Sequence, residues 1–178
     1  TAACEGSLRR LRVDRIDVYQ LHAVDPRVPL EESVGSLIEL QRAGKIRHIG
    51  LCNVDVGELL RARRSARIVS VQNLYNLTNR TSEDVVEACE QNGMVFVPWY
   101  PLAAGPLARP RSPLGHVAAR SHATPAQVAL AWLLQRSPVM LPIPGTSSVA
   151  HLEDNVRAAA LRLPQEDYAA LADLYQGA

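Results

Sequence analysis

Arg15-Ile-Asp-Val-Tyr-Gln-Leu-His22-Ala-Val-Asp-Pro26 is a short apolar run of strand-forming residues that ends on a histidine and then enters a loop. Ile, Val and Tyr favour extended backbone, so residues 16–21 are predicted to form a buried strand. Parallel α/β folds often present a catalytic group at the carboxyl end of a strand, just before the chain turns into a helix. The stretch therefore predicts a parallel α/β fold, with His22 as the first candidate for chemistry.

The same order of strand and helix recurs about five times along the chain. The predicted strands cover 16–21, 47–52, 68–73, 94–99 and 139–143. No hairpin signature separates them, which favours a parallel sheet with right-handed crossovers. The spacing fits either a doubly wound sheet or a (β/α) barrel. No G-x-G-x-x-G follows a strand, so the usual Rossmann unit is not expected.

The predicted helices alternate with these strands and carry recognisable start signals. They are a leading helix that ends near Arg12, a helix that begins at Thr124, and helices over 29–43, 56–64, 83–92, 149–159 and 164–175. In the helix over 149–159, Leu152 and Val156 are expected to face inward. Thr124 and Gln127 form a capping box, with proline at the first helical position. A Pro/Gly-rich loop is expected over 100–115. Because the sequence contains no linker or shift in composition, residues 1–178 are predicted to be a single domain.

Composition excludes several classes of partner and site. The net charge is +1 over 178 residues, which gives no reason to expect nucleic acid or an anionic membrane. The longest apolar run, residues 128–134, is too short to span a bilayer. The three cysteines are scattered without metal-ligand spacing, which favours a reducing, cytoplasmic setting and predicts no metal site.

Polar and aromatic residues follow the predicted strands at the positions where a barrel would present them. They are His22, then Cys52 and Asn53, then Gln72 and Asn73, then Trp99 and Tyr100, and finally Gly145-Thr146-Ser147-Ser148. Amide side chains can satisfy both the donor and the acceptor of a carboxamide, and a flat aromatic ring can stack on a heterocycle. Hydroxyl and backbone N–H groups at the start of a helix bind phosphate. Together these features suit a nicotinamide dinucleotide.

Four segments resemble the aldo-keto reductase family, in order, over nearly the whole chain. Lys45–Asn53 resembles the family signature G-K-x-R-x-I-G-[LV]-S-N, and Asp17–His22 resembles the strand that bears the catalytic histidine. Val71–Asn76 is similar to the family's V-Q-x-x-Y-[NS] strand, and Pro142–Asn155 to its cofactor-phosphate segment. The bacterial branch that contains pyridoxal reductases has the most similar motifs.

The resemblance implies a parallel (β/α)8 TIM barrel that transfers hydride between NADP(H) and a small-molecule aldehyde or ketone. This chain would contain about the last five strand-helix units. By position, His22 would orient the carbonyl oxygen. The cofactor would contact Cys52, Asn53 and Gln72 at its carboxamide, Trp99 at the nicotinamide ring, Tyr100 and Leu102 along the pyrophosphate, and Gly145, Thr146, Ser147, His151, Asp154 and Asn155 around the adenosine.

The chain departs from the family pattern in two ways. Many members have lysine and arginine at the positions of Gly145 and His151, where they hold the 2′-phosphate. Here a helix N-terminus, Thr146, Ser147 and the histidine at 151 would take that role, which favours NADP(H) and keeps NAD(H) as the alternative. The family's catalytic aspartate, tyrosine and lysine lie in the first three strand-helix units, which have no counterpart here. We therefore expect the C-terminal part of a longer reductase.

Other interpretations remain open from the sequence. The chain could be a nucleotide-binding remnant without chemistry, or a regulatory subunit like the channel-associated members of the family. A different (β/α) barrel with chance matches is a third interpretation. Cys52 is interpreted as a packing residue because no base is evident beside it. The sequence makes no prediction about the oligomeric state.

Overall fold

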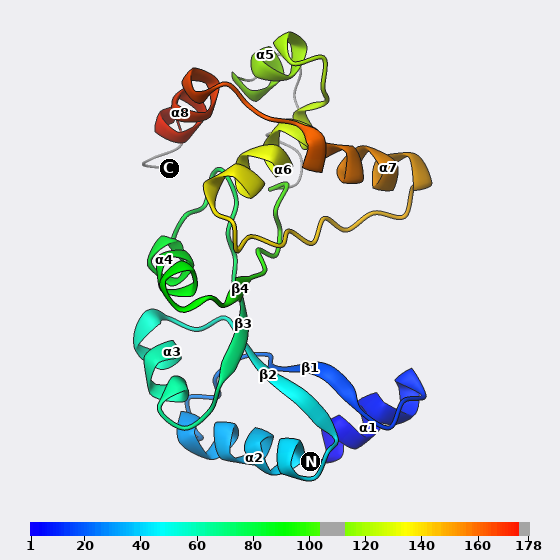
Figure 1. Cartoon of the computed structure of the whole chain (residues 1–178), viewed down its shortest axis with the longest axis vertical. Helices are drawn as coiled ribbons and strands as arrows, with labels where there is room; N and C mark the ends of the chain where they lie inside the picture. The colour runs from blue at the N-terminus through cyan, green and yellow to red at the C-terminus, as the bar shows by residue number, and fades with distance from the viewer. Residues whose placement is uncertain (104–112, 175–178) are drawn as a thin grey trace.

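The computed structural model describes residues 1–103 and 113–174, which form a parallel sheet with helices along its outer side. The strands are β1 (Ile16–Leu21), β2 (Ile46–Cys52), β3 (Ile68–Gln72) and β4 (Val95–Phe96), in the order β1-β2-β3-β4. The helices are α1 (Ala2–Leu11), α2 (Leu30–Arg42), α3 (Val56–Arg63), α4 (Glu83–Asn92), α5 (Pro113–Arg120), α6 (Pro125–Arg136), α7 (Val149–Arg157), a 3₁₀ turn (Ala158–Ala160) and α8 (Gln165–Leu174). Figure 1 shows an open arc, with α2, α3 and α4 along its convex side. None of the described helices is long and apolar enough to cross a membrane.

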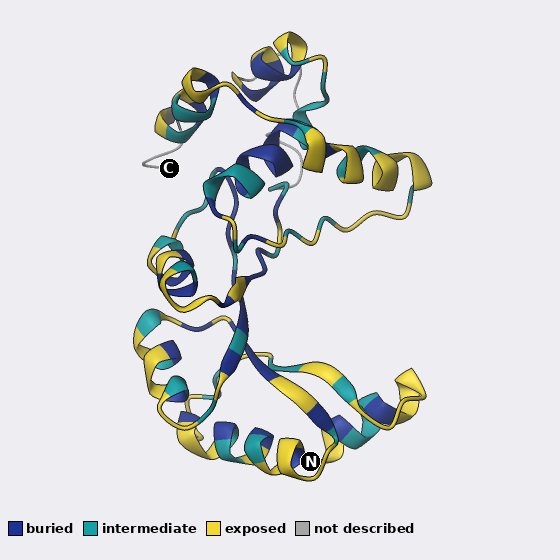
Figure 2. Ribbon diagram, viewed as in Figure 1, coloured by how far each residue is buried: buried dark blue, intermediate teal, exposed yellow. Residues whose placement is uncertain are grey.

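The strand register gives the two faces of the sheet different characters. Leu51 pairs with Leu21 on one side and Val71 on the other. This row lies on the face towards α3, because Leu51 and Val71 belong to the same hydrophobic core as Leu59 of that helix. Leu51 and Val71 are fully buried there. Neighbouring residues in a strand point to opposite faces, so the rows on either side of Leu51 belong to the open face. Val18 and Val95 are exposed on that face. Figure 2 shows exposed segments, in yellow, within the sheet.

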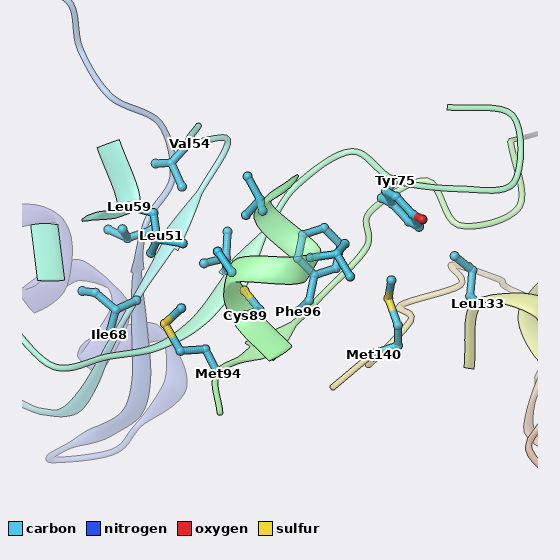
Figure 3. Packing of buried hydrophobic residues seen from close by; sticks show 14 of the residues in the cluster. Leu51, Val54, Leu59, Ile68, Tyr75, Cys89, Met94, Phe96, Leu133 and Met140 are labelled. Carbon is cyan, nitrogen blue, oxygen red and sulfur yellow. The ribbon is translucent and has the colours of Figure 1, made fainter. Parts of the chain in front are cut away.

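The buried core runs from the sheet through α4 to α6. Figure 3 follows it from Leu51 and Ile68 through Cys89 and Phe96 towards Tyr75. The rings of Tyr75 and Phe96 meet edge to face, with their centroids 5.7 Å apart. Each large apolar side chain removed from water contributes about 1.5–3 kcal/mol, so this continuous core stabilises the whole arc.

The prediction of an extended strand over 139–143 is wrong. This segment makes one isolated parallel bridge, between Met140 and Phe96. Phe96 N donates to Val139 O at 2.9 Å, and Leu141 N donates to Phe96 O at 2.8 Å. The ladder stops there because proline has no N–H to donate, and prolines occupy 142 and 144.

The strand predicted over 94–99 is shortened to β4 by the same chemistry, since Pro98 interrupts its donors. Backbone pairing with β3 nevertheless continues past Pro98. Val97 N donates to Val71 O at 2.8 Å, and Trp99 N donates to Asn73 O at 3.0 Å. The chain thus stays beside β3 as far as the residues that follow the strand ends.

Two predictions about helices need correction, and one is confirmed. Part of the loop expected over 100–115 lies outside the described residues, but its last part begins α5, which was not predicted. Leu152 and Val156 were expected to face inward, yet they are 53% and 67% exposed. The capping box of α6 is present, with Gln127 N donating to Thr124 Oγ1 at 3.2 Å and Thr124 N to Gln127 Oε1 at 2.9 Å.

Candidate active site

The register brings three predicted site residues to one edge of the sheet. Cys52 pairs directly with Gln72, and Leu21 pairs with Leu51, so His22 follows one row later beside Cys52. All three therefore lie on the open face of the sheet, at the carboxyl ends of β1, β2 and β3. This edge is where parallel α/β enzymes place their reactive groups.

Asn53 connects the ends of these strands. Its backbone is left-handed, with φ 54°, a conformation that asparagine tolerates better than most residues. Its backbone N donates to Gln72 O at 3.0 Å, and its side-chain Nδ2 donates to His22 O at 3.0 Å. Its Oδ1 accepts a hydrogen bond from Trp99 Nε1 at 2.9 Å. One asparagine thus joins His22, Gln72 and Trp99 into a strand-end cluster, the group of four residues that we regard as the core of the site.

Two members of the cluster keep their side chains free. Within the described parts of the chain, neither the His22 imidazole nor the Gln72 amide has a hydrogen-bonding partner. His22 is exposed and Gln72 is half-buried, so both are accessible to a ligand on the open face. The site therefore offers one imidazole and one complete amide, with a donor and an acceptor each.

Cys52 is more deeply buried than the cluster, and Leu102 is buried to a degree similar to Gln72 and Trp99. Cys52 is 3% exposed, and burial raises the pKa of its thiol, which keeps the sulfur protonated and unreactive. This state supports the interpretation of Cys52 as a packing residue. Leu102 is half-buried against the hydrophobic core, and its predicted contact with a pyrophosphate stays a prediction.

Tyr100 and two neighbouring asparagines shape the loop after Trp99. Tyr100 is half exposed and left-handed, with φ 59°, and its carbonyl accepts a hydrogen bond from Asn76 Nδ2 at 3.0 Å. Asn73 is buried, and its Nδ2 donates to Val54 O at 2.7 Å. Both asparagines hold backbone in place. Asn73 was among the strand-end residues identified in the sequence, but neither asparagine was assigned a contact with the cofactor. The sequence signal for Asn73 was an amide directly after a strand, and Asn76 is the last residue of the Val71–Asn76 motif.

The second group of predicted residues surrounds the start of α7. Ser148 is the N-cap, and its Oγ accepts a hydrogen bond from His151 N at 3.4 Å. Thr146 Oγ1 accepts one from Ser148 N at 3.1 Å, which closes the turn. Gly145, Thr146, Ser147 and His151 are all exposed. The turn and the helix start together present hydroxyl and N–H groups to solvent, as an anion site requires.

Asp154 and Asn155 lie one turn further along α7 and are half-buried. Asp154 Oδ1 accepts a hydrogen bond from Arg157 Nη2 at 2.5 Å, and its backbone O accepts one from Gln127 Nε2 at 3.1 Å. In residues 1–103 and 113–174 no hydrogen bond or ion pair links this group to the strand-end cluster. The same ranges contain no gathering of three or more His, Cys, Asp or Glu side chains that could hold a metal ion.

Comparison with known proteins assigns this arrangement to a family. The family model "Aldo/keto reductase family" matches residues 1–176. The chain is 50% identical over 165 residues to an uncharacterised oxidoreductase of Schizosaccharomyces pombe, covering 93% of this chain and 54% of the relative. It is 45% identical over 170 residues to pyridoxine 4-dehydrogenase of Escherichia coli, covering 92% and 59%. It thus spans little more than half the length of these relatives.

A solved structure gives the same assignment for the fold. The aldo/keto reductase from Klebsiella pneumoniae in complex with NADP and acetate matches with a TM-score of 0.87 and 35% identity, covering 98% of this chain and 64% of that one. The predicted α/β fold of the aldo-keto reductase type is therefore confirmed. The chain belongs to the aldo/keto reductase family.

Proposed function

We propose that this chain supplies the cofactor-binding part of an NADP(H)-dependent oxidoreductase that reduces small aldehydes or ketones to alcohols. The observation that carries the proposal is the strand-end cluster, where the free Gln72 amide, the exposed His22 and the Trp99 ring are joined through Asn53. Support comes from the Klebsiella pneumoniae relative, whose structure contains NADP and acetate. The Gln72 amide and the His22 imidazole suit binding of a flat ring that bears a carboxamide. They suit a metal site or a nucleophilic mechanism less well.

NADP(H) would supply the hydride when bound. Asn53 and Gln72 would hold the carboxamide of its nicotinamide, and Trp99 would stack on the ring. His22 would orient the substrate by donating a hydrogen bond to the carbonyl oxygen, where negative charge develops as hydride arrives at the carbonyl carbon. The proton that completes the alcohol would come from residues outside these 178.

The start of α7 would bind the phosphate that distinguishes NADP(H) from NAD(H). Thr146 and Ser147 offer hydroxyl groups there, and the first turn of the helix offers backbone N–H groups. His151 is exposed on the same turn and would add a donor or a positive charge. Gly145, Asp154 and Asn155 would line the adenosine end, and Tyr100 and Leu102 the pyrophosphate between the two groups. NAD(H) is the alternative cofactor.

The test is turnover of NADPH by the complete protein with a panel of aldehydes and ketones that includes pyridoxal. His22→Ala should lower kcat/KM by about 10²-fold or more, since it removes the group that orients the carbonyl. His48→Ala is the matched control, because His48 is an exposed histidine of β2 that lies outside the cluster. Equal activity of wild type and His22→Ala would contradict the proposed role. NADPH binding without turnover would favour a catalytically incomplete nucleotide-binding protein instead.

A further inference from the structure

The side chain of Asn53 is fixed in one of its two amide orientations. Oxygen and nitrogen have similar shapes, so an asparagine amide can usually turn over at little cost. Here its partners allow only one arrangement, because the Trp99 indole N–H can only donate and the His22 carbonyl can only accept. Turning the amide over would place N–H against N–H and oxygen against oxygen, and both hydrogen bonds would be lost.

The backbone holds both ends of the Asn53–Trp99 hydrogen bond. Asn53 N donates to Gln72 O at 3.0 Å, and Trp99 N donates to Asn73 O at 3.0 Å, so each residue is tied to β3. The main chain therefore holds the two side chains within hydrogen-bonding distance of each other. A group that is positioned in advance loses less conformational entropy when it binds its ligand.

We propose that Trp99 is a positioning residue whose indole N–H fixes the orientation of the Asn53 amide. The Asn53 amide in turn sets the orientation in which the site binds the oxygen and the NH₂ of a primary carboxamide. Trp99 occupies one of the two lone pairs of Oδ1, which makes Oδ1 a weaker acceptor for a ligand, whereas Nδ2 keeps one N–H that no other described residue uses. Asn53 therefore receives the carboxamide oxygen, and the free Gln72 amide accepts from the carboxamide NH₂. A phenylalanine or tyrosine ring could stack in place of Trp99 but has no ring N–H to hold Asn53. This inference rests on the proposed binding of NADP(H).

The first experiment is a double-mutant cycle on the complete protein, with the Kd for NADPH measured by calorimetry. Trp99→Phe keeps a flat ring and removes the N–H, and it should weaken binding about 10-fold. Asn53→Ala should weaken it at least as much, and the double variant should bind no worse than Asn53→Ala alone. Losses that multiply in the double variant would overturn the proposal, because they would mean that Trp99 acts by stacking alone. Thermal melting of each variant confirms that it is folded.

The second experiment compares NADPH with its 3-acetylpyridine analogue, which keeps the carbonyl oxygen and replaces the amide NH₂ with a methyl group. In the proposed orientation, Gln72→Leu weakens the binding of NADPH more than the binding of the analogue. Asn53→Ala weakens the binding of both dinucleotides to the same extent. The opposite pattern would overturn the proposal, because Asn53 would then face the NH₂. If the wild-type protein binds neither dinucleotide, the proposed function itself fails, which is a different result from either pattern.

Discussion

Gly50 lies in β2 between Gln20 of β1 and Ser70 of β3, where no side chain has room. A Cβ at this position would lie 2.5 Å from Ser70 Oγ and 2.8 Å from Gln20 Cγ. The space lets Gln20 Nε2 reach across the glycine and donate to Ser70 Oγ at 3.4 Å. Gly50→Ala should therefore displace the Gln20 and Ser70 side chains and lower the free energy of unfolding by about 1–3 kcal/mol, as measured by chemical denaturation.

Gly35 provides the matched control for this substitution. It lies inside α2, and a Cβ there would meet nothing within 4 Å. Gly35→Ala should raise stability by about 0.5–1 kcal/mol, because alanine restricts the unfolded chain and fits the helix. Adding Ser70→Gly to Gly50→Ala should recover part of the loss. The steric explanation is wrong if Gly50→Ala is as stable as the wild type.

The positions of the site residues could be predicted from the sequence, but their contacts could not. His22, Asn53, Gln72 and Trp99 each follow a strand, and parallel strands bring such residues to one edge. The two hydrogen bonds of the Asn53 side chain join it to residues 31 and 46 positions away. No local pattern contains those partners. Asn73 shows the same limit, since it resembles Asn53 in sequence and yet is buried and holds backbone.

At the scale of elements, Glu83 at the start of α4 joins the end of α6 to the chain after β3. Tyr75 Oη donates to Glu83 Oε2 at 2.5 Å, and Arg136 Nε donates to Glu83 Oε1 at 2.6 Å. Burial raises the pKa of the Tyr75 hydroxyl above its usual value of 10.0, and the hydrogen bond to Glu83 adds to the rise. The folded protein therefore keeps this proton at a pH where the unfolded chain releases it.

Tyr75→Phe should test this junction through the pH dependence of stability. Near pH 7 the variant should be about 1–2 kcal/mol less stable, because it loses a hydrogen bond to a carboxylate. Above pH 10 the wild type should lose up to about 1.4 kcal/mol per pH unit, since the unfolded state binds fewer protons than the folded state. The difference between the two proteins should therefore shrink as pH rises from 10, as measured by urea denaturation.

Two comparisons make that result specific to Tyr75. Burial also raises the pKa of Cys89, to about 12, so its thiol weakens stability in alkali in both proteins and cancels in the difference. Tyr100→Phe removes a hydroxyl from a half-exposed ring instead and should change the free energy of unfolding near pH 7 by less than about 0.5 kcal/mol. A gap between wild type and Tyr75→Phe that stays constant to pH 11 would show that the proton of Tyr75 is not retained on folding.

Helices were easier to predict than strands because their signals are local. The capping box at Thr124 lies where the sequence places it, and α4 covers the predicted range 83–92. The strands depend on partners far along the chain, and prolines at 98, 142 and 144 remove donors that a ladder needs. Apolar spacing along α7 indicated which residues share a face, but it could not indicate whether another element covers that face.

At the scale of the molecule, the arc has an open side that sequence patterns alone do not reveal. β1 pairs only with β2 among the described strands, so its other edge has backbone N–H and C=O groups without ladder partners. Val18 and Val95 are exposed on the open face of the sheet. Figure 2 shows α7 mostly exposed at the opposite end of the arc. Soluble proteins rarely leave an edge and apolar surface of this kind uncovered.

The 178-residue chain, produced alone, should therefore bind the dye ANS and associate with itself as its concentration rises, as followed by sedimentation velocity. The triple variant Val149→Gln, Leu152→Gln and Val156→Gln should associate less and keep its stability, because α7 contains no buried residue. A matched triple change of buried residues, Val128, Leu130 and Leu133 of α6 to Gln, should instead unfold the chain. If the chain is part of a longer reductase, as we propose, the complete protein should bind less ANS per molecule. A monomeric chain that binds no dye would show that this apolar surface is covered from within the chain.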